Sequence, residues 1–309
     1  MSARDYTSIV APLREAAVQA AWTQWGAVAF GAAAKAPARA IVDPEALVLA
    51  TLVLEARERR LNRLVQMWIG AGSRLLSTGR LASLLRDYPK SVTPKVAAFA
   101  AEAVGAGDAR WKRLAGKAKA KVARRPSVEA VTLDLRQPSK VMLRLRLALG
   151  VGIKADALAF LLGRTGVRAT VREVASGTGY FERAVRRALD DLVAARFLAV
   201  QATSPISYYA QWANWEQLLG VDQNHAPLWR CWHELYLVVV ALDGWGREAD
   251  TARWSRYVAA SRLRDVFERI EPFRTRAYVH EAPDWEKPSE EWIEGEWIAQ
   301  LADRLKGVV

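Results

Sequence analysis

The sequence predicts a mainly α-helical protein with several domains and one small β-hairpin. Two observations support this fold class. Ala, Leu, Val and Arg dominate long stretches with few Gly or Pro residues, and apolar residues recur at three- and four-residue steps. Of the 309 residues, 51% are hydrophobic, which is enough for two or three globular domains and too rich for a chain that is disordered throughout.

Residues 1–108 are expected to form an N-terminal helical domain. One helix should begin at Asp43-Pro44, because aspartate caps a helix and proline suits its first position. Further helices are predicted over residues 73–87 and from Thr93 to Val104. No residue pattern in this block indicates catalysis.

Residues 109–139 are predicted to be a basic linker. The stretch 110–125 contains eight basic residues and no acid. Two interpretations remain open: an arm that lies along the phosphates of a nucleic acid, or a solvated linker. The candidate DNA contacts of this basic arm are Lys112, Arg113, Lys117, Lys119, Lys121, Arg124 and Arg125.

Residues 140–215 carry the most informative pattern. An apolar helix is predicted over residues 155–162 and should end at Gly163. Thr170 can cap the next helix, and Glu173, three residues later, completes a capping box.

A second helix should follow a glycine-bearing turn at residues 176–180. It covers residues 181–196, with an apolar face and an opposite charged face. Two short strands are predicted next, over residues 197–201 and 207–211, with a turn between them. These strands are the one β-hairpin expected in the chain.

This order of elements resembles the winged helix-turn-helix superfamily, particularly the MarR- and ArsR-like transcription regulators. The shared pattern is Thr-x-x-Glu-Val/Leu-Ala, a glycine-bearing turn, then x-x-x-Val-x-Arg-x-Leu-x-x-Leu and a wing. Residues 170–198 match it nearly position for position. The resemblance covers residues 140–215 and implies a winged helix-turn-helix domain whose 181–196 helix reads the major groove of double-stranded DNA.

The charged face of the 181–196 helix carries side chains suited to DNA. The planar fork of arginine can bind guanine O6 and N7 together or grip a phosphate, glutamate can accept from a cytosine amino group, and phenylalanine can touch a thymine methyl group. The candidate contacts on this helix are Phe181, Glu182, Arg183, Arg186 and Arg187. Thr170 and the wing residue Ser204 complete the candidate DNA-binding set.

Two features depart from the family pattern. Phe181 stands where the family usually has a small capping residue, and the wing has no Lys or Arg between Phe197 and Gln211. We therefore expect wing contacts to be limited to Ser204, Ser207 and backbone amides.

The net charge of +12 is unevenly distributed. Residues 1–125 hold 21 Lys and Arg against 9 Asp and Glu, residues 141–215 hold 10 against 5, and residues 216–309 hold 12 against 17. A basic body with an acidic end suits a polyanionic partner bound by the first two thirds of the chain. A solubilising surface gives the same balance, so charge alone does not separate the two.

Residues 216–309 are predicted to form a C-terminal Trp-rich helical region. Helices are expected over about 227–242, 250–270 and 289–305. Its tryptophans are Trp229, Trp232, Trp245, Trp254, Trp285, Trp292 and Trp297. Because the chain's 13 tryptophans exceed what a small helical core needs, we expect part of this surface to form a homodimer interface, and an unidentified protein partner stays open there.

No pattern of an enzyme class is present in the sequence. Gly116-Lys117 lacks the leading glycine of a phosphate-binding loop, because Trp111 stands at that position, and no GxSxG occurs. The single cysteine, Cys231, excludes an intramolecular disulfide, and no paired His or Cys spacing indicates a metal. We expect no enzyme activity, no cofactor and no metal site.

The compartment is expected to be the cytoplasm. The longest strongly apolar run, residues 235–242, is too short to cross a bilayer, and polar residues interrupt the alanine-rich stretch 16–36. The first functional hypothesis is therefore a cytoplasmic, DNA-binding transcription regulator. The alternative is a protein-interaction module, an antitoxin or adaptor, that uses the winged helix as a scaffold.

Overall fold

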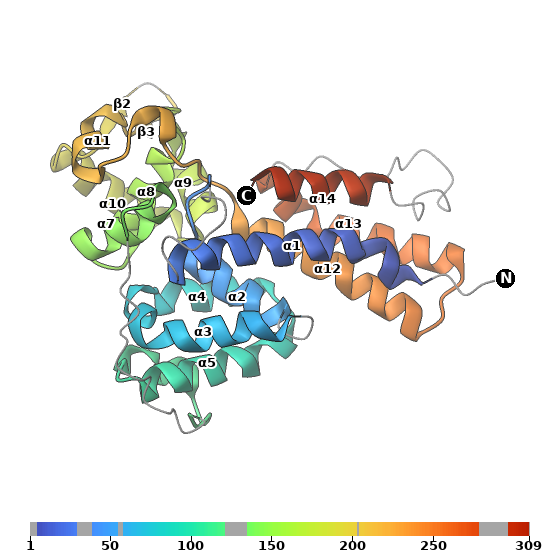
Figure 1. Ribbon diagram of the computed structural model, residues 1–309. Coiled ribbons are helices and arrows are strands. Elements are labelled where there is room, and N and C mark those ends of the chain that lie inside the picture. Colours follow the sequence, from blue (N-terminus) through green and yellow to red (C-terminus); the bar gives the residue numbers. More distant parts are fainter. Residues whose placement is uncertain are drawn as a thin grey trace. The chain divides into compact units, whose positions relative to one another are not determined.

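The computed structural model describes residues 5–29, 39–54, 58–120, 135–202, 204–277 and 296–308. The chain divides into two compact units (Figure 1). One combines Met1–Trp22 with Cys231–Val309, and the other is Thr23–Arg230. Both are built mainly from helices, with one small sheet in the second, so the mainly α fold class is confirmed.

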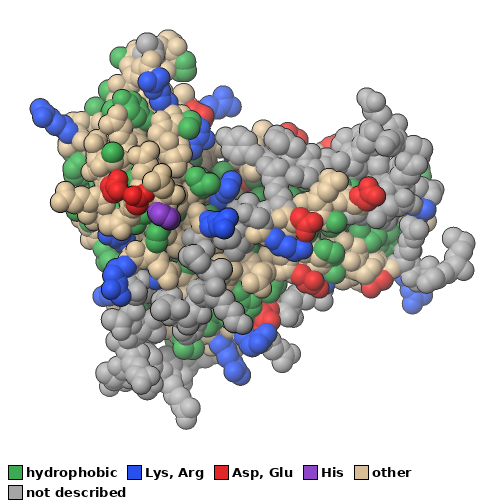
Figure 2. Space-filling view, turned by 45° about the horizontal axis from the view of Figure 1, so that its top comes forward, with side chains coloured by type: hydrophobic (Ala, Val, Ile, Leu, Met, Phe, Trp, Pro, Cys, Tyr) green, Lys and Arg blue, Asp and Glu red, His purple; other side chains and the backbone are tan. Residues whose placement is uncertain are grey.

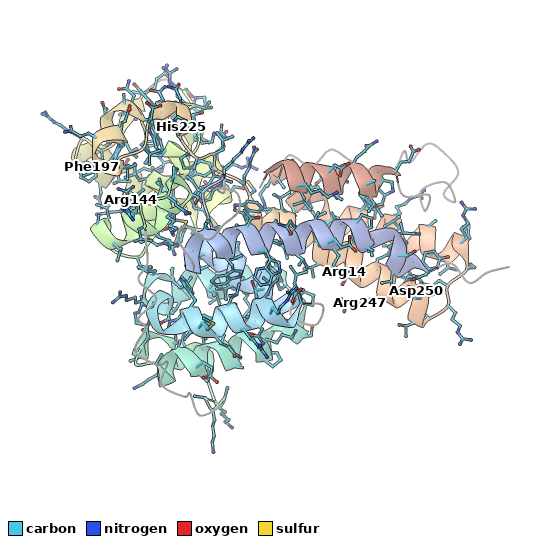
Figure 3. All side chains as sticks on the ribbon, in the orientation of Figure 1. Arg14, Arg144, Phe197, His225, Arg247 and Asp250 are labelled. Carbon is cyan, nitrogen blue, oxygen red and sulfur yellow. The ribbon has the colours of Figure 1, made fainter. Side chains whose placement is uncertain are left out.

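The first unit is formed by helices from the two ends of the chain. They are the beginning of α1 (Tyr6–Ala29) with α12 (Trp232–Thr251), α13 (Arg256–Arg276) and α14 (Glu296–Val308). Asp250 caps α1, because its carboxylate accepts hydrogen bonds from the backbone N–H groups of Tyr6 at 2.7 Å and Thr7 at 2.8 Å (Figure 3). Arg14 pairs with Asp243 at 3.1 Å, which also holds α1 to α12.

The second unit begins with a group of helices, here called the helical layer. Its members are α2 (Pro44–Leu54), α3 (Arg59–Gly72), α4 (Thr78–Leu84), α5 (Thr93–Gly105) and α6 (Lys112–Ala115). The predicted start of α2 is confirmed, since the Asp43 carboxylate accepts from the backbone N–H of Ala46 at 3.1 Å. The single helix predicted over residues 73–87 is wrong. The Ser77 side chain caps a new helix there, so α4 stands between the 3-10 turns Ser73–Leu75 and Leu85–Asp87.

The remainder of the second unit contains the small sheet. Its elements are α7 (Val141–Leu149), α8 (Ile153–Leu162), β1 (Ala169–Thr170), α9 (Val171–Thr178), α10 (Glu182–Ala194), β2 (Ala199–Gln201), β3 (Ser207–Tyr209) and α11 (Ala213–Leu219). The sheet is antiparallel in the order β1-β3-β2, with Tyr208 opposite both Ala169 and Val200. The predicted hairpin is confirmed. Strand β1 was not predicted, because two residues are too few to show an alternating pattern.

Contacts between α7, α10 and α11 close the far side of this region. Arg144 on α7 donates hydrogen bonds to the carbonyl oxygens of Leu218 and Leu219, which caps the end of α11 (Figure 3). Phe197, just beyond α10, packs edge-on against Trp215 of α11 with ring centroids 5.4 Å apart. Helix α11 is therefore held to α7 by Arg144 and to the segment after α10 by Phe197.

The tryptophans behave differently from the expectation. The helix predicted from residue 227 begins at Trp232, and Trp229 lies before it, where its backbone N–H donates to the Gly163 carbonyl at 2.8 Å and its ring packs on Phe160. Trp285 and Trp292 lie outside the described residues. Among the tryptophans that the structure describes, none is exposed, so their number no longer supports a dimer interface. The homodimer stays a prediction.

No helix in the described ranges is both long and apolar enough to cross a membrane.

Candidate nucleic-acid interface

Helix α9 begins as the sequence predicts. The Thr170 hydroxyl oxygen accepts from the backbone N–H of Glu173 at 3.3 Å, and the Glu173 carboxylate accepts from the backbone N–H of Thr170 at 2.7 Å. This is the expected capping box. Because the Thr170 hydroxyl also donates to Glu173 at 2.9 Å, it is engaged in the cap.

Helix α10 has one packed face and one face in solvent. Val185, Ala188, Leu189 and Leu192 are buried, and helical geometry turns the residues between them outward. The candidate contacts Phe181, Glu182, Arg183, Arg186 and Arg187 are all exposed, and Phe181 keeps 74% of its surface. The structure therefore brings these five predicted residues onto one solvent-facing surface.

The two acids in the C-terminal half of α10 have partners. Asp191 pairs with Lys154 of α8 at 2.8 Å, and Asp190 accepts a hydrogen bond from the Tyr208 hydroxyl at 3.1 Å. Within the described part of the chain, by contrast, Arg183, Arg186 and Arg187 have no hydrogen-bond or ion-pair partner. The N-terminal half thus carries three unpaired arginines beside a single acid.

The first turn of α10 adds to this positive end. Phe181 occupies the capping position and supplies no side-chain hydrogen bond. The helix dipole places roughly half a positive charge at such an end, where backbone N–H groups lack intrahelical partners. The arginines and the helix end therefore favour the same kind of ligand, an anion.

Two further arginines, Arg168 and Arg172, were not among the candidate DNA contacts predicted from the sequence. Arg172 is exposed in the first turn of α9. Arg168 is also exposed, and its guanidinium lies 5.5 Å from the centre of the Tyr209 ring of β3. Their places on either side of the capping Thr170 were the available signal.

The hairpin of β2 and β3 is uncharged. Val200 and Ile206 expose 43% and 44% of their surfaces, and Ser204 is exposed beside them. Residue 203 lies outside the described residues. The β2–β3 hairpin therefore offers apolar and hydroxyl groups, as the absence of Lys and Arg from its sequence indicated.

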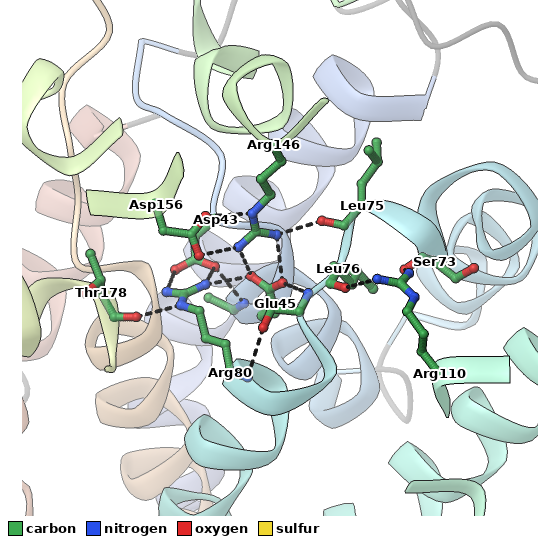
Figure 4. Close-up of polar contacts among 12 residues, drawn as sticks. Asp43, Glu45, Ser73, Leu75, Leu76, Arg80, Arg110, Arg146, Asp156 and Thr178 are labelled. Carbon is green, nitrogen blue, oxygen red and sulfur yellow. Dashed lines mark hydrogen bonds and ion pairs between the residues drawn. The ribbon is translucent and has the colours of Figure 1, made fainter. Parts of the chain in front are cut away.

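Charged side chains from the start of α2 and from α4, α7 and α8 form a fully buried cluster, here called the charge cluster (Figure 4). Its members are Asp43, Glu45, Arg80, Arg146 and Asp156. Arg146 donates to Asp156 and to Glu45, each at 2.7 Å, and also to the Leu75 carbonyl at 2.8 Å. Arg80 donates to Asp43 through both terminal nitrogens, at 2.5 and 2.6 Å, and to Glu45 at 2.6 Å.

The oppositely charged groups of the charge cluster stabilise one another's ionised forms. Burial alone would lower the pKa of each arginine, but the surrounding carboxylates outweigh it and hold the pKa of Arg80 and of Arg146 above the ordinary value. Burial likewise opposes ionisation of Asp43, yet the charge and hydrogen bonds of Arg80 hold the Asp43 pKa below its usual value. These three groups are therefore charged at neutral pH.

The cluster reaches the turn between α9 and α10. Arg80 Nε donates to the carbonyl of Thr178, the last residue of α9, at 2.6 Å, and the Tyr180 hydroxyl donates to Asp156 at 2.8 Å. Burial and the charge of Asp156 raise the pKa of Tyr180, so that it stays a donor. Residues 140–215 therefore share a buried polar core with the helical layer.

The basic arm lies on a different part of the second unit. Lys112, Arg113, Lys117 and Lys119 are exposed, and none has a partner among the described residues. Arg110 is structural, since it donates to Asp108 at 2.7 Å and to the Ser73 carbonyl at 3.0 Å. Lys121, Arg124 and Arg125 lie outside the described residues. Helix α6 packs on α5, whereas α10 packs on α8 and α9, so the structure does not join the arm to α10.

The two units differ strongly in charge. Thr23–Arg230 holds 32 Lys and Arg against 16 Asp and Glu, and the other unit holds 13 against 17. On the face shown in Figure 2, the Lys and Arg side chains lie in separate groups rather than in one continuous stripe. Among the described residues, no group of three or more His, Cys, Asp or Glu side chains is placed to hold a metal ion.

Comparison with known proteins adds no relative: no family model, curated protein or solved structure matches the chain. A function is therefore inferred from the site itself and from the resemblance of residues 170–198 to the winged helix-turn-helix pattern.

Proposed function

We propose that the chain is a double-stranded-DNA-binding protein, and specifically a transcription regulator that reads the major groove with α10. The observation that carries this proposal is the set of three exposed, unpaired arginines on the N-terminal half of a helix whose opposite face is packed. The order of elements from α8 to β3, helix, strand, two helices and a hairpin, agrees with a winged helix-turn-helix.

The chemistry of α10 suits this role. A major groove about 12 Å wide admits one helix, and side chains at the N-terminal end of a recognition helix meet base edges there. Arg183, Arg186 and Arg187 can each bind a guanine edge or a phosphate with the paired donors of the guanidinium. The excess positive charge of Thr23–Arg230 would draw the duplex toward this unit.

The assembly and compartment follow as further parts of the proposal. Proteins that read DNA with a helix-turn-helix usually bind two half-sites as a dimer, so we expect a homodimer. One cysteine in 309 residues fits the reducing cytoplasm.

The test is fluorescence anisotropy of the full chain with a labelled mixed-sequence duplex of about 24 base pairs, a little over two helical turns. The triple variant R183A/R186A/R187A should weaken binding at least about tenfold, and the salt slope should fall by roughly 0.9 for each phosphate that the variant no longer neutralises. A charge-matched control, R63A/R253A/R269A, removes three other exposed arginines and should bind like the parent. If the α10 triple variant folds and binds as well as the parent, α10 is not the reader.

One observation favours the alternative, a protein-interaction module such as an antitoxin or adaptor. Phe181, Val200 and Ile206 are exposed apolar side chains on α10 and the wing, where a DNA reader more often carries polar groups. The same titration separates the two functions. A parent chain that binds no duplex even at about 50 mM salt, where phosphate contacts are strongest, would favour the interaction module.

A further inference from the structure

We propose that Arg86, which lies in the 3-10 turn directly after α4 and outside residues 140–215, is a further DNA-binding residue. Its ligand would be a backbone phosphate beside the start of α10. The inference rests on the proposed function and extends the DNA surface onto a part of the chain that no winged-helix pattern covers.

Helix α4 contacts the turn before α10. Gly179 has a left-handed backbone, with φ of 74°, and a Cβ there would lie only 2.7 Å from Cδ2 of Leu84. Arg80, on the same helix as Leu84, donates to the Thr178 carbonyl at 2.6 Å. Helix α4 therefore touches two successive residues of the turn that leads into Phe181 and α10.

Arg86 lies directly after α4. It follows Leu84 by two residues, in the 3-10 turn Leu85–Asp87, and two residues of a 3-10 helix advance the backbone by about 4 Å. Arg86 therefore begins close to the turn, and its long side chain is exposed. Among the described residues it has no ion-pair or hydrogen-bond partner, so its charge is open to an external anion.

Buried residues before and after Arg86 along the chain hold α4 and the 3-10 turn Leu85–Asp87 in place. Before Arg86, the Arg80 guanidinium is buried and bonded to Asp43 and Glu45. After it, Tyr88 is buried. Charge-assisted hydrogen bonds are shorter and stronger than neutral ones, so α4 holds its position against the turn. An arginine on such a segment can meet a phosphate without first ordering a loop.

The chemistry separates Arg86 from the arginines of α10. A residue that comes from outside the recognition helix is expected to reach the phosphate backbone rather than base edges, and phosphate contacts set position without reading sequence. Loss of Arg86 should therefore weaken binding to every duplex alike and lower the salt dependence. An arginine that serves only as a solubilising charge would change neither quantity.

The experiment compares the full-length parent with R86A, R86K and the control R63A. Arg63 is an exposed arginine on α3 of the same helical layer, and it has no partner among the described residues. Anisotropy titrations would use three duplexes: one of mixed sequence, one of alternating dA·dT and one of dG·dC. Each titration would be repeated at salt concentrations between about 50 and 200 mM. Circular dichroism checks that each variant is folded.

The proposal expects R86A to weaken binding about three- to tenfold on all three duplexes and to lower the salt slope by about 0.9. R86K, which keeps the charge, should retain most of the slope, and R63A should match the parent. If R86A binds like R63A, the role of Arg86 is overturned while the proposed function stands. A loss of binding by R86A on only one of the three duplexes would also overturn the role of Arg86. A parent that binds none of the duplexes overturns both.

Discussion

Replacement of Arg146 by methionine tests the charge cluster most severely. Methionine replaces the aliphatic part of the arginine side chain with another unbranched chain but is shorter and lacks the guanidinium. In the folded protein this guanidinium makes five hydrogen bonds, two to Asp156, two to Glu45 and one to the Leu75 carbonyl. After the change Asp156 keeps only the hydrogen bond from Tyr180, and three buried carboxylates face one buried arginine.

The expected cost is large. Removal of one partner from a buried ion pair typically costs about 3–5 kcal/mol, because the remaining charge stays buried without compensation. Total stability of a domain is about 5–15 kcal/mol, so Arg146→Met should remove a large share of it. For a unit of about 200 residues, where 1 kcal/mol shifts Tm by about 2–4 °C, Tm should fall by roughly 6–20 °C.

Urea unfolding followed by circular dichroism measures the effect. The matched control is Arg144→Met on the same helix, where a half-buried arginine bonds only the end of α11, and it should cost about 1 kcal/mol. The double variant Arg146→Met with Asp156→Asn removes one charge of each sign. Its loss of unfolding free energy should be smaller than the summed losses of the two single variants by about 1–3 kcal/mol. A loss below about 1 kcal/mol for Arg146→Met, or additive single changes, would refute the account of the cluster.

Three other predictions concern pH, backbone strain and the basic arm. Asp43, despite its burial, and Asp250 have pKa values lowered in the folded state, so their contribution to stability is full above about pH 4 and is lost as pH falls through the folded-state values. For these two groups, urea midpoints should stay level from pH 6 to about pH 4 and should fall below that pH. Gly179→Ala should destabilise the fold by about 1–2 kcal/mol and so lower Tm, because alanine is strained in the left-handed backbone at this position. Arg196→Gly should leave Tm equal or higher, because Arg196 is exposed and has φ of 60°, which glycine adopts without strain. Alanine at Lys112, Arg113, Lys117 and Lys119 together should flatten the salt dependence of DNA binding by about 0.9 for each phosphate contact, and an unchanged slope would leave the arm a linker.

The parts of the fold that the sequence predicts well are those with local signals. The capping box of α9 joins residues three apart, and the buried face of α10 follows from helical spacing, so both could be read along the chain. Strand β1 and the break at Ser77 escaped, because a two-residue strand and a cap inside an apolar stretch leave little pattern.

The charge cluster could not be predicted in the same way. Arg146 meets Glu45 across 101 residues of sequence, and Arg80 meets Thr178 across 98. Asp43 and Glu45 read as an ordinary acidic helix start, while Arg146 and Asp156 stand among apolar residues of short helices. A charged side chain on an apolar helix was the one available signal, and it indicates burial with a partner without naming the partner.

The candidate site divides along the same line. The exposure of Arg183, Arg186 and Arg187 was predictable, because it follows from the periodicity of one helix. The closeness of α4 to the turn was not, because Leu84 and Gly179 are brought together only by the tertiary fold. The DNA role of both surfaces stays a prediction.

Selection from a random pool of duplexes measures whether α10 reads the sequence of DNA. The full-length parent and the variant Arg183→Ala would each be used to enrich bound duplexes, which are then sequenced. The account predicts that the parent enriches a defined motif. Arg183→Ala should relax the preference at one position of that motif, by about 1–3 kcal/mol of discrimination between bases. A parent that retains duplexes without enriching any sequence would contradict sequence reading by α10.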